Sequence, residues 1–304
     1  MRSLLTLAAA TFVLVAAMSA HATQPPSAVK EGQPRVLRLG AVCGGPTAVT
    51  VFREIRYYLA QHGLKTEYTL YSNYDALVKA LHEGQVDIAW NAPIAHGKFH
   101  VLAGDSQALV MRDVDVNYRV KLIVRKDANI ASPSDLQGKT MIFGSCDSAD
   151  ATVLPVYFLR KEGVNFENVK ILSLHDQCDA KGVPCHSQQH VWKALMEGKG
   201  DAGIISQDRW AKLQKNEPEA AKFKEIWTSP PFGHCVWTAR KDFDKETGAR
   251  FTKLMTAMDR KDPLTCEILD LEHCSRWVPG SQEGYAVLFD ALRQKQPLPS
   301  VLKK

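Results

Sequence analysis

The feature that most constrains this chain is a regular alternation of strand and helix patterns after residue 34. Residues 35–42 (RVLRLGAV) form an extended β-branched run, and residues 48–62 carry apolar side chains at helical spacing. The alternation continues with a strand at 66–71, a helix at 73–83 and a strand at 86–90. This βαβαβ order predicts an α/β fold with a parallel sheet, in which ligand-binding loops gather at the carboxyl ends of the strands.

A near-repeat within the chain suggests two similar units. Residues 80–89 (ALHEGQVDIA) resemble residues 194–203 (ALMEGKGDAG), and both indicate a helix end, a glycine stop, an aspartate and a buried strand. Two ordinary αβ turns would give the same pattern. The other interpretation is a two-lobed protein, with lobe I at 35–117, lobe II at 118–237, and C-terminal helices at 238–304 that return to lobe I. Two chain crossings between lobes make a hinge, and a hinge makes a cleft.

The first 22 residues have the pattern of a secretory signal. Arg2 gives a positive start, residues 4–18 form an apolar run, and Ala20-His21-Ala22 is a small-x-small cleavage site. The apolar run is short for a membrane span. We therefore expect cleavage near Ala22, a periplasmic mature protein and no membrane insertion, with an uncleaved anchor as the alternative.

Composition excludes other classes of protein. The chain has 304 residues, of which 45% are hydrophobic and 23% charged, as is typical of a globular protein. The net charge is +5, but basic and acidic residues are interspersed and no basic face or arm is visible. We therefore expect no nucleic-acid partner.

The seven cysteines must be explained in an oxidising compartment. Cys178 and Cys185 flank a turn-rich stretch, and Cys266 and Cys274 lie in one C-terminal segment. We expect each of these two pairs to form a disulfide that closes a small loop, although the sequence leaves the connectivity open. Three cysteines are left over, so at least one thiol stays free or pairs between molecules.

The three remaining cysteines, Cys43, Cys146 and Cys235, coincide with loops that should line the cleft. Such loops follow strands or open helices, and the crossing back to lobe I joins them. The expected segments are 43–47, 91–93, 145–148, 185–187, 206–207 and 233–235. The residues expected to bind ligand are Cys43, Gly44, Thr47, Asn91, Cys146, Asp147, Ser148, His186, His234 and Cys235.

Several motifs in a fixed order resemble a known family over about residues 35–241. They are residues 87–93 (DIAWNAP), 118–127 (YRVKLIVRKD), 135–140 (DLQGKT) with 143–144 (FG), 185–187 (CHS), 200–203 (GDAG) and 229–231 (SPP). Together they resemble periplasmic solute-binding proteins of the phosphonate-binding type. The resemblance implies a type II Venus-flytrap fold, with each lobe a parallel-rich sheet flanked by helices, and usually an ABC permease as partner.

One loop departs from the family pattern. Phosphonate-binding members carry a loop similar to F-G-D-P-N-S-T-S-G, in which hydroxyls and amide N–H groups hold the anion. Here residues 143–151 read FGSCDSADA, so Ser148 is the hydroxyl that remains, while Ala149 and Asp150 replace the other two. An aspartate repels an anion unless it is protonated. The departure therefore weakens the case for a phosphate or phosphonate ligand.

Within the family, the chain resembles the periplasmic arsenite-binding proteins that report to a sensor histidine kinase controlling arsenite oxidation. Trivalent arsenic exchanges its hydroxyls for sulfur, and soft centres prefer thiolate ligands. The main hypothesis is that Cys43, Cys146 and Cys235 converge on arsenite, or on the equivalent antimony oxyacid, and latch the lobes together. Alternatively, two of these cysteines form a disulfide and the third is buried.

Other functions are left open. The chain could bind phosphate, phosphite or phosphonate for an ABC transporter. His186 and His190 have an i, i+4 spacing that zinc or copper can use, but His186 as a helix start and His190 as a packed or solvated residue explain the spacing better. A thiol- or metal-dependent enzyme is the candidate from another class, but no G-x-S-x-G turn or ordered nucleophile–base pair is present. We expect no enzyme activity and no cofactor.

Overall fold

The computed structural model describes residues 36–174, 187–294, 298–299 and 302. The expected signal segment lies outside the described residues, and so do Cys178, Cys185 and His186. Among the helices of the described ranges, none is both long enough and apolar enough to cross a membrane.

The first sheet contains the predicted βαβαβ unit. Strands β1, β2 and β3 pair in parallel, with β1 in the middle, as expected from the sequence. Three further strands, β10, β4 and β11, extend the sheet beyond β3 in antiparallel pairings. The strands are β1 (Leu37–Val42), β2 (Thr66–Tyr71), β3 (Ile88–Asn91), β4 (Ser106–Arg112), β10 (Val236–Arg240) and β11 (Trp277–Pro279).

The second sheet repeats this plan on a smaller scale. Its strand order is β7-β6-β8-β5-β9, and the β6 pairings with β7 and β8 are parallel. Strand β5 is antiparallel to both of its neighbours, so both sheets are mixed rather than wholly parallel. The strands are β5 (Val120–Arg125), β6 (Thr140–Phe143), β7 (Lys170–Ser173), β8 (Ala202–Ser206) and β9 (Phe223–Thr228).

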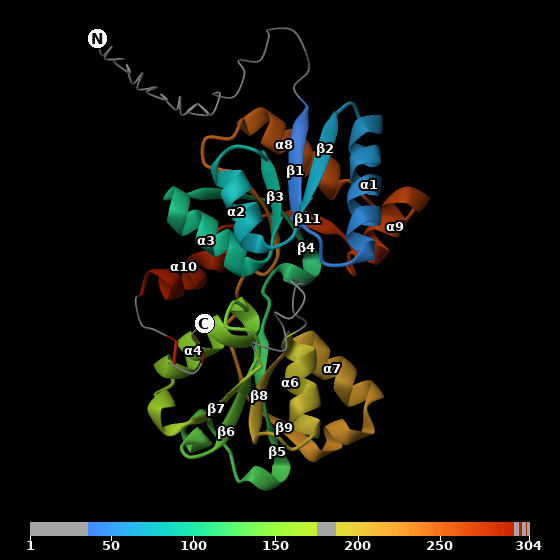
Figure 1. The fold of residues 1–304 in the computed structure, drawn as a ribbon. Coiled ribbons are helices and arrows are strands. Elements are labelled where there is room, and N and C mark those ends of the chain that lie inside the picture. The colour runs from blue at the N-terminus through green and yellow to red at the C-terminus, as the bar shows by residue number, and fades with distance from the viewer. Residues whose placement is uncertain (1–35, 175–186, 295–297, 300–301, 303–304) are drawn as a thin grey trace, which may run out of the picture. The chain divides into compact units, whose positions relative to one another are not determined.

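Helices cover the sheets (Figure 1). Helix α1 shows why: Val51, Phe52, Ile55, Tyr58 and Leu59 fall on one face at helical spacing and are buried. The longer helices are α1 (Pro46–Gln61), α2 (Tyr74–His82), α3 (Pro93–Ala103), α4 (Leu154–Lys161), α6 (Ser187–Met196), α7 (Gln207–Asn216), α8 (Lys245–Thr256), α9 (Pro263–Leu271) and α10 (Ala286–Arg293). The short helices are η1 (Asp113–Asp115), η2 (Lys126–Ala128), η3 (Pro133–Leu136), the π-helical η4 (Ala149–Val153), η5 (Phe166–Asn168), η6 (Pro218–Lys222) and η7 (Glu283–Tyr285).

The near-repeat occupies equivalent places in the two sheets. It joins α2 to β3 in the first sheet and α6 to β8 in the second. Gly84 and Gly198 both have φ of 71°, in the left-handed region that stops a helix without steric cost to glycine. The shared pattern therefore marks the same structural step in both sheets.

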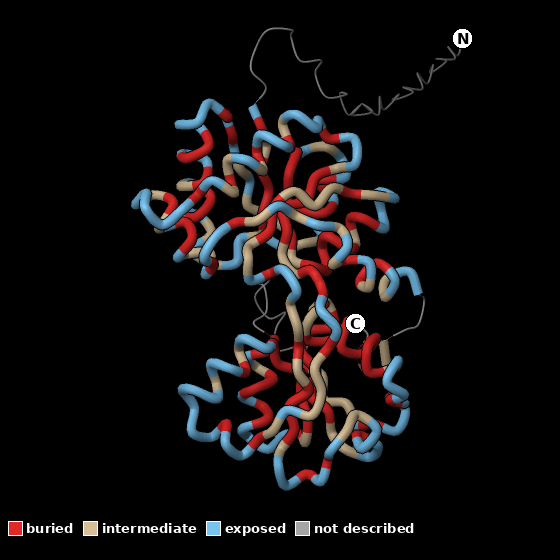
Figure 2. The backbone as a smooth tube through the Cα atoms, turned by 180° about the vertical axis from the view of Figure 1, so that it is seen from behind, coloured by how far each residue is buried: buried red, intermediate tan, exposed pale blue. Residues whose placement is uncertain are grey.

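Two segments carry the chain between the sheets. They lie side by side, because Tyr118 N–H donates to Phe232 O at 2.8 Å and Phe232 N–H donates to Tyr118 O at 3.0 Å. The return to the first sheet is complete at Val236, where β10 begins, slightly before the expected boundary at residue 237. The largest buried apolar cluster includes β5 residues and Tyr285 and Leu288 of the C-terminal helices. Figure 2 shows mostly buried backbone in the interior of the molecule and exposed stretches at its periphery.

The expected disulfide between Cys266 and Cys274 is wrong, because both are free thiols. Cys266 lies on α9 with Sγ 3.8 Å from a carboxylate oxygen of Asp270 and 3.9 Å from Arg260. Cys274 is 4% exposed and packs in the core of the first sheet. The two sulfur atoms therefore occupy different environments, one polar and one apolar.

Candidate functional site

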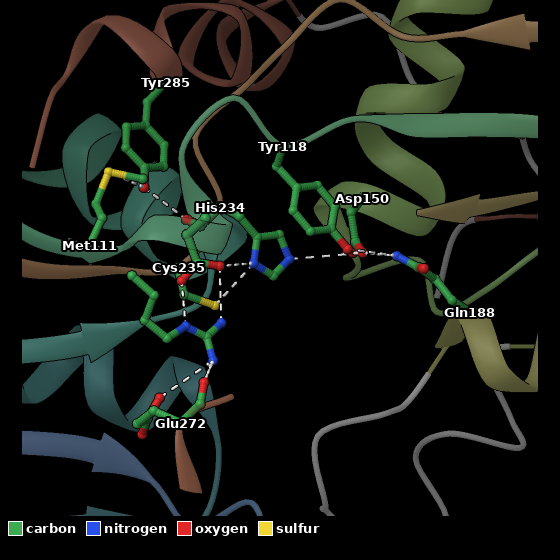
Figure 3. A network of polar contacts seen from close by, with 10 residues as sticks. Met111, Tyr118, Asp150, Gln188, His234, Cys235, Glu272 and Tyr285 are labelled. Atoms are coloured by element: carbon green, nitrogen blue, oxygen red, sulfur yellow. Dashed lines mark hydrogen bonds and ion pairs between the residues drawn. The ribbon is translucent and has the colours of Figure 1, made fainter. Parts of the chain in front are cut away.

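The crossing segments bring a charged cluster together (Figure 3). Arg112 ends β4, Asp115 ends η1, and His234 and Cys235 directly precede β10. His234 N–H donates to Asp115 O at 2.9 Å, so backbone bonding fixes the two segments against each other. The antiparallel pairing of β10 with β4 explains why these residues, distant in sequence, meet here.

Arg112 holds Asp115 through two side-chain hydrogen bonds. Its Nε donates to Oδ2 at 2.5 Å and its Nη2 donates to Oδ1 at 3.0 Å. Nη1 donates to Glu272 O at 2.9 Å, and the guanidinium lies 5.4 Å from the Trp90 ring centroid. Burial alone would raise the pKa of Asp115, but the charge and hydrogen bonds of Arg112 and the bond from His234 outweigh it and lower the pKa to about 2. Asp115 is therefore a permanent carboxylate.

His234 lies at the centre of the cluster. Its Nδ1 is 2.8 Å from Asp115 Oδ1 and 3.3 Å from Cys235 Sγ, and its ring stacks on Tyr118 with centroids 4.2 Å apart. Burial would lower the pKa of His234, but the neighbouring Cys235 charge and the hydrogen bond to Asp115 raise it well above its ordinary value. Tyr285 Oη donates to His234 O at 2.8 Å and fixes the backbone.

Asp150 of η4 faces this histidine, and Gln188 of α6 is bonded to Asp150. Asp150 Oδ2 lies 3.9 Å from His234 Nε2 and accepts a hydrogen bond from Gln188 Nε2. Gln188 is itself fixed, because its Oε1 accepts from Ser206 N–H at 2.7 Å. Ser148 Oγ donates to Asp150 Oδ1 at 2.6 Å and caps η4 by accepting from Ala151 N–H at 3.0 Å. The Ser148 hydroxyl, which is the one retained from the family loop, is therefore already hydrogen-bonded within the protein.

The three cysteines of the main hypothesis occupy different positions. Cys43 is exposed after β1, Cys146 is 8% exposed after β6, and Cys235 is half-buried beside His234. Within the described residues, the group of three candidate ligand side chains whose donor atoms lie within 4.8 Å of one another is Asp115, His234 and Cys235. Cys43 and Cys146 do not join that group in this structure, so the convergence of three thiols stays a hypothesis.

Asn91, another expected ligand residue, is buried in an unusual way. It ends β3, is 0% exposed, and pairs in register with Val236. Neither its side-chain oxygen nor its nitrogen has a hydrogen-bond partner among the described residues. A buried primary amide without partners costs free energy, and a site for a polar ligand is one place where that cost is offset on binding.

Gly144 explains how the loop after β6 is held. A Cβ at this position would collide with the Ser187 side chain and would come within 3.0 Å of Ala151 Cβ. Ser187 Oγ also accepts from Ser145 N–H at 3.1 Å. The glycine in the Phe-Gly motif therefore lets the start of α6 pack directly on the loop. Of the other expected residues, Cys146, Ser148 and half-buried Asp147 belong to this loop. Gly44 is exposed just before α1, and Thr47 is exposed in the first turn of α1.

Sequence reasoning missed several residues of the cluster. Arg112 ends β4 and Asp115 follows it, so the strand-end rule could have selected both had that strand been recognised. Tyr118 and Gln188 are polar residues inside segments already quoted or adjacent to them. No sequence pattern pointed to Glu272, because it lies at the end of α9, far along the chain. Burial raises the pKa of Glu272, and the charge of Arg112 opposes that shift.

The architecture defines a class: two mixed α/β sheets joined by adjacent crossing segments, as in type II periplasmic binding proteins. Comparison with solved structures supports it. PhnD1 from Prochlorococcus marinus (MIT 9301), in complex with methylphosphonate, matches with a TM-score of 0.64 at 21% identity over 86% of this chain and 98% of that chain. XAC2383 from Xanthomonas citri, bound to ATP, matches with a TM-score of 0.68 at 17% identity over 86% and 99%. At these identities the likeness shows the fold alone.

The chain belongs to the family of periplasmic substrate-binding proteins of phosphonate ABC transporters, whose family model matches residues 47–285. A probable ABC transporter phosphite-binding protein, PhnD1, from Prochlorococcus marinus (strain MIT 9301) is 23% identical over 83% of this chain and 87% of the relative. The phosphate-import protein PhnD of Mycolicibacterium smegmatis is 27% identical over 83% and 80%. The family implies a periplasmic location and a binding role rather than an enzymatic one, and it confirms the predicted family and fold.

Proposed function

We propose that this protein captures a small phosphorus oxyanion of the phosphite or phosphonate type and presents it to an ABC permease. The family assignment over residues 47–285 supports this ligand class, which was the alternative to arsenite among the predictions from sequence. The observation that carries the proposal is the unpartnered, fully buried amide of Asn91 at the end of β3. Asn91 ends β3, which pairs with β10, and β10 begins just after the cationic His234.

Asp150 gives this proposal a specific chemistry. A carboxylate repels a fully ionised anion, but it accepts a hydrogen bond from an anion that keeps a P–OH group. Phosphite and phosphonate monoanions have such a group, and sulfate and sulfonates have none. With Asp150 placed by Ser148 and Gln188, the site is expected to select protonated phosphorus oxyanions and to reject sulfonates.

A second candidate function keeps the arsenite hypothesis. Cys235 Sγ is half-buried 3.3 Å from His234 Nδ1, and sulfur is the ligand type that a soft centre such as trivalent arsenic prefers. Arsenite is a neutral trihydroxide near neutral pH, so the carboxylates do not repel it. In this case Cys43 and Cys146 would have to approach Cys235 on binding, and the partner would be a sensor kinase.

Isothermal titration calorimetry on the reduced mature protein tests the two candidates together. We expect saturable binding of phosphite and methylphosphonate, none of methanesulfonate, and weakening by at least about tenfold in Asn91→Leu, the loss expected for a hydrogen bond to a charged group. No heat with any phosphorus oxyanion would refute the proposal. Saturable arsenite binding that Cys235→Ser abolishes, and that Cys266→Ser retains, would establish the second candidate instead.

A further inference from the structure

The triad of Asp115, His234 and Cys235 has the composition of a metal site. It offers one carboxylate oxygen, one imidazole nitrogen and one sulfur, all within 4.8 Å of one another. Asp115 is buried, and the other two side chains are partly buried. Carboxylate, imidazole and thiolate are the three ligand types that zinc takes in proteins.

The distances within this triad are close to those of a metal complex. Asp115 Oδ1 and His234 Nδ1 are 2.8 Å apart, and His234 Nδ1 and Cys235 Sγ are 3.3 Å apart. Zinc bond lengths of about 2.0–2.3 Å in a tetrahedron place such ligand atoms roughly 3.3–3.6 Å apart. Shifts of a few tenths of an ångström therefore bring these two pairs to the spacing of zinc ligands, and the third pair, Asp115 and Cys235, lies within 4.8 Å.

The charge around the triad is compatible with a cation. Asp115, Asp150 and Glu272 contribute three carboxyl groups to the neighbourhood, against the guanidinium of Arg112 and, when it is protonated, the imidazole of His234. A divalent metal that replaces the Nδ1 proton of His234 and the thiol proton of Cys235 leaves the net charge of this neighbourhood unchanged.

The contacts around the triad resemble an outer coordination shell. Arg112 donates to both oxygens of Asp115 and orients the carboxylate. His234 Nε2 faces Asp150 at 3.9 Å, and a carboxylate behind the second ring nitrogen is the usual partner of a metal-binding histidine. Tyr285 fixes the backbone of His234 from the other side.

We propose that Asp115, His234 and Cys235 bind one divalent transition-metal cation of the zinc class. Binding releases the proton of His234 Nδ1 and the thiol proton of Cys235. Three protein ligands leave a fourth coordination position for water or for an oxygen of a bound anion. The site is independent of which oxyacid the protein carries.

Cobalt(II) spectroscopy and zinc calorimetry on the reduced, chelator-treated mature protein test the site. The probes are the two metals alone, without any oxyanion. We expect one zinc per chain, tetrahedral cobalt bands and a thiolate-to-cobalt charge-transfer band. Cys235→Ser should remove the charge-transfer band and weaken zinc binding at least tenfold, and His234→Gln should weaken zinc binding likewise.

Cys266→Ser is the matched control, because Cys266 is a free thiol on α9 outside the triad, and it should bind like the parent protein. Circular dichroism confirms that each variant is folded. Absence of zinc binding in the parent protein would overturn the proposal, and so would a charge-transfer band that survives in Cys235→Ser. Methylphosphonate binding by the metal-free protein is measured separately, so failure of the metal site leaves the proposed transport function standing.

Discussion

Asp87, which directly precedes β3, and Arg38 in β1 are joined by hydrogen bonds from both backbone and side chains. Asp87 N–H donates to Arg38 O at 2.8 Å, and the fully buried Asp87 carboxylate accepts from Arg38 N–H at 2.9 Å and from Nε and Nη2 at 3.1 and 2.8 Å. In the second sheet, Asp201 N–H donates to Thr140 O and Thr140 N–H donates to the Asp201 carboxylate, both at 2.8 Å. The aspartate of the near-repeat therefore ties two parallel strands together in each sheet.

This relationship predicts unequal effects of equal substitutions. Asp87→Asn leaves the Arg38 guanidinium without a charged acceptor, so the free energy of unfolding should fall by about 2 kcal/mol. Asp201→Asn loses fewer bonds and should cost about half as much. Urea unfolding at neutral pH measures both variants. An equal loss of unfolding free energy in the two variants, or a larger loss in Asp201→Asn, would contradict the larger stabilising role of Asp87.

The sequence predicted the repeated parts of the fold well because local patterns determine them. Strand and helix periodicity placed β1, α1, β2, α2 and β3 within about two residues. The glycine and aspartate of the near-repeat mark a turn whose geometry is local. The antiparallel strands β4, β10 and β11 were not predicted, since their pairing depends on a chain return that no local pattern encodes.

The dependence on long-range strand pairing also explains which residues of the candidate site the sequence predicted. Asn91 was predicted because it follows a predicted strand, where ligands bind, and His234 because it lies in the predicted crossing between the lobes. Arg112 and Asp115 meet His234 only because β10 pairs with β4. Cys43 and Cys146 do lie in loops after strands, but position in a loop does not determine which way a sulfur atom points. The loop rule therefore selected some of the segments that form the cluster, but it did not determine how their side chains meet.

Replacing Asn91 should separate stability from binding. Leucine has a similar branched shape and removes both unpartnered polar atoms, so Asn91→Leu should stabilise the ligand-free protein by about 1 kcal/mol. The same change should weaken methylphosphonate binding, since the amide is lost. Thermal unfolding with and without methylphosphonate measures both effects. A destabilised variant with unchanged affinity would show that Asn91 serves packing alone.

Asp150 should control which oxyanions bind. In Asp150→Asn the amide keeps an acceptor for Ser148 or Gln188 but removes the negative charge that faces His234. We expect this variant to bind methanesulfonate, which the parent protein rejects, and to bind methylphosphonate with less dependence on the ligand's second ionisation. Calorimetry below and above that ionisation measures the difference. The control is Asp127→Asn, which changes an exposed carboxylate in η2, outside the expected site. Unaltered selectivity in Asp150→Asn would exclude a role for the carboxylate in ligand choice.

His96 should set the acid limit of stability. It is 0% exposed, with Nδ1 2.9 Å from Thr238 Oγ1 and Nε2 3.1 Å from Gln282 Oε1. Burial lowers its pKa from 6.5 to about 4, although the Gln282 hydrogen bond opposes the shift. The unfolded chain binds this proton first as pH falls, so stability is complete above about pH 6.5 and declines toward pH 4 by roughly 3 kcal/mol.

His96→Gln removes this titration while keeping a polar side chain. The variant is expected to be less stable at neutral pH, because the fit to Thr238 and Gln282 is imperfect, but its stability should change less between neutral and acidic pH than that of the parent protein. His82→Gln, at an exposed histidine near the end of α2, should leave the parent's pH dependence intact. Urea unfolding across this pH range gives the comparison. If His96→Gln keeps the parent's pH dependence, the acid sensitivity arises from another group. His96 would then contribute nothing to the difference in bound protons between the folded and unfolded states.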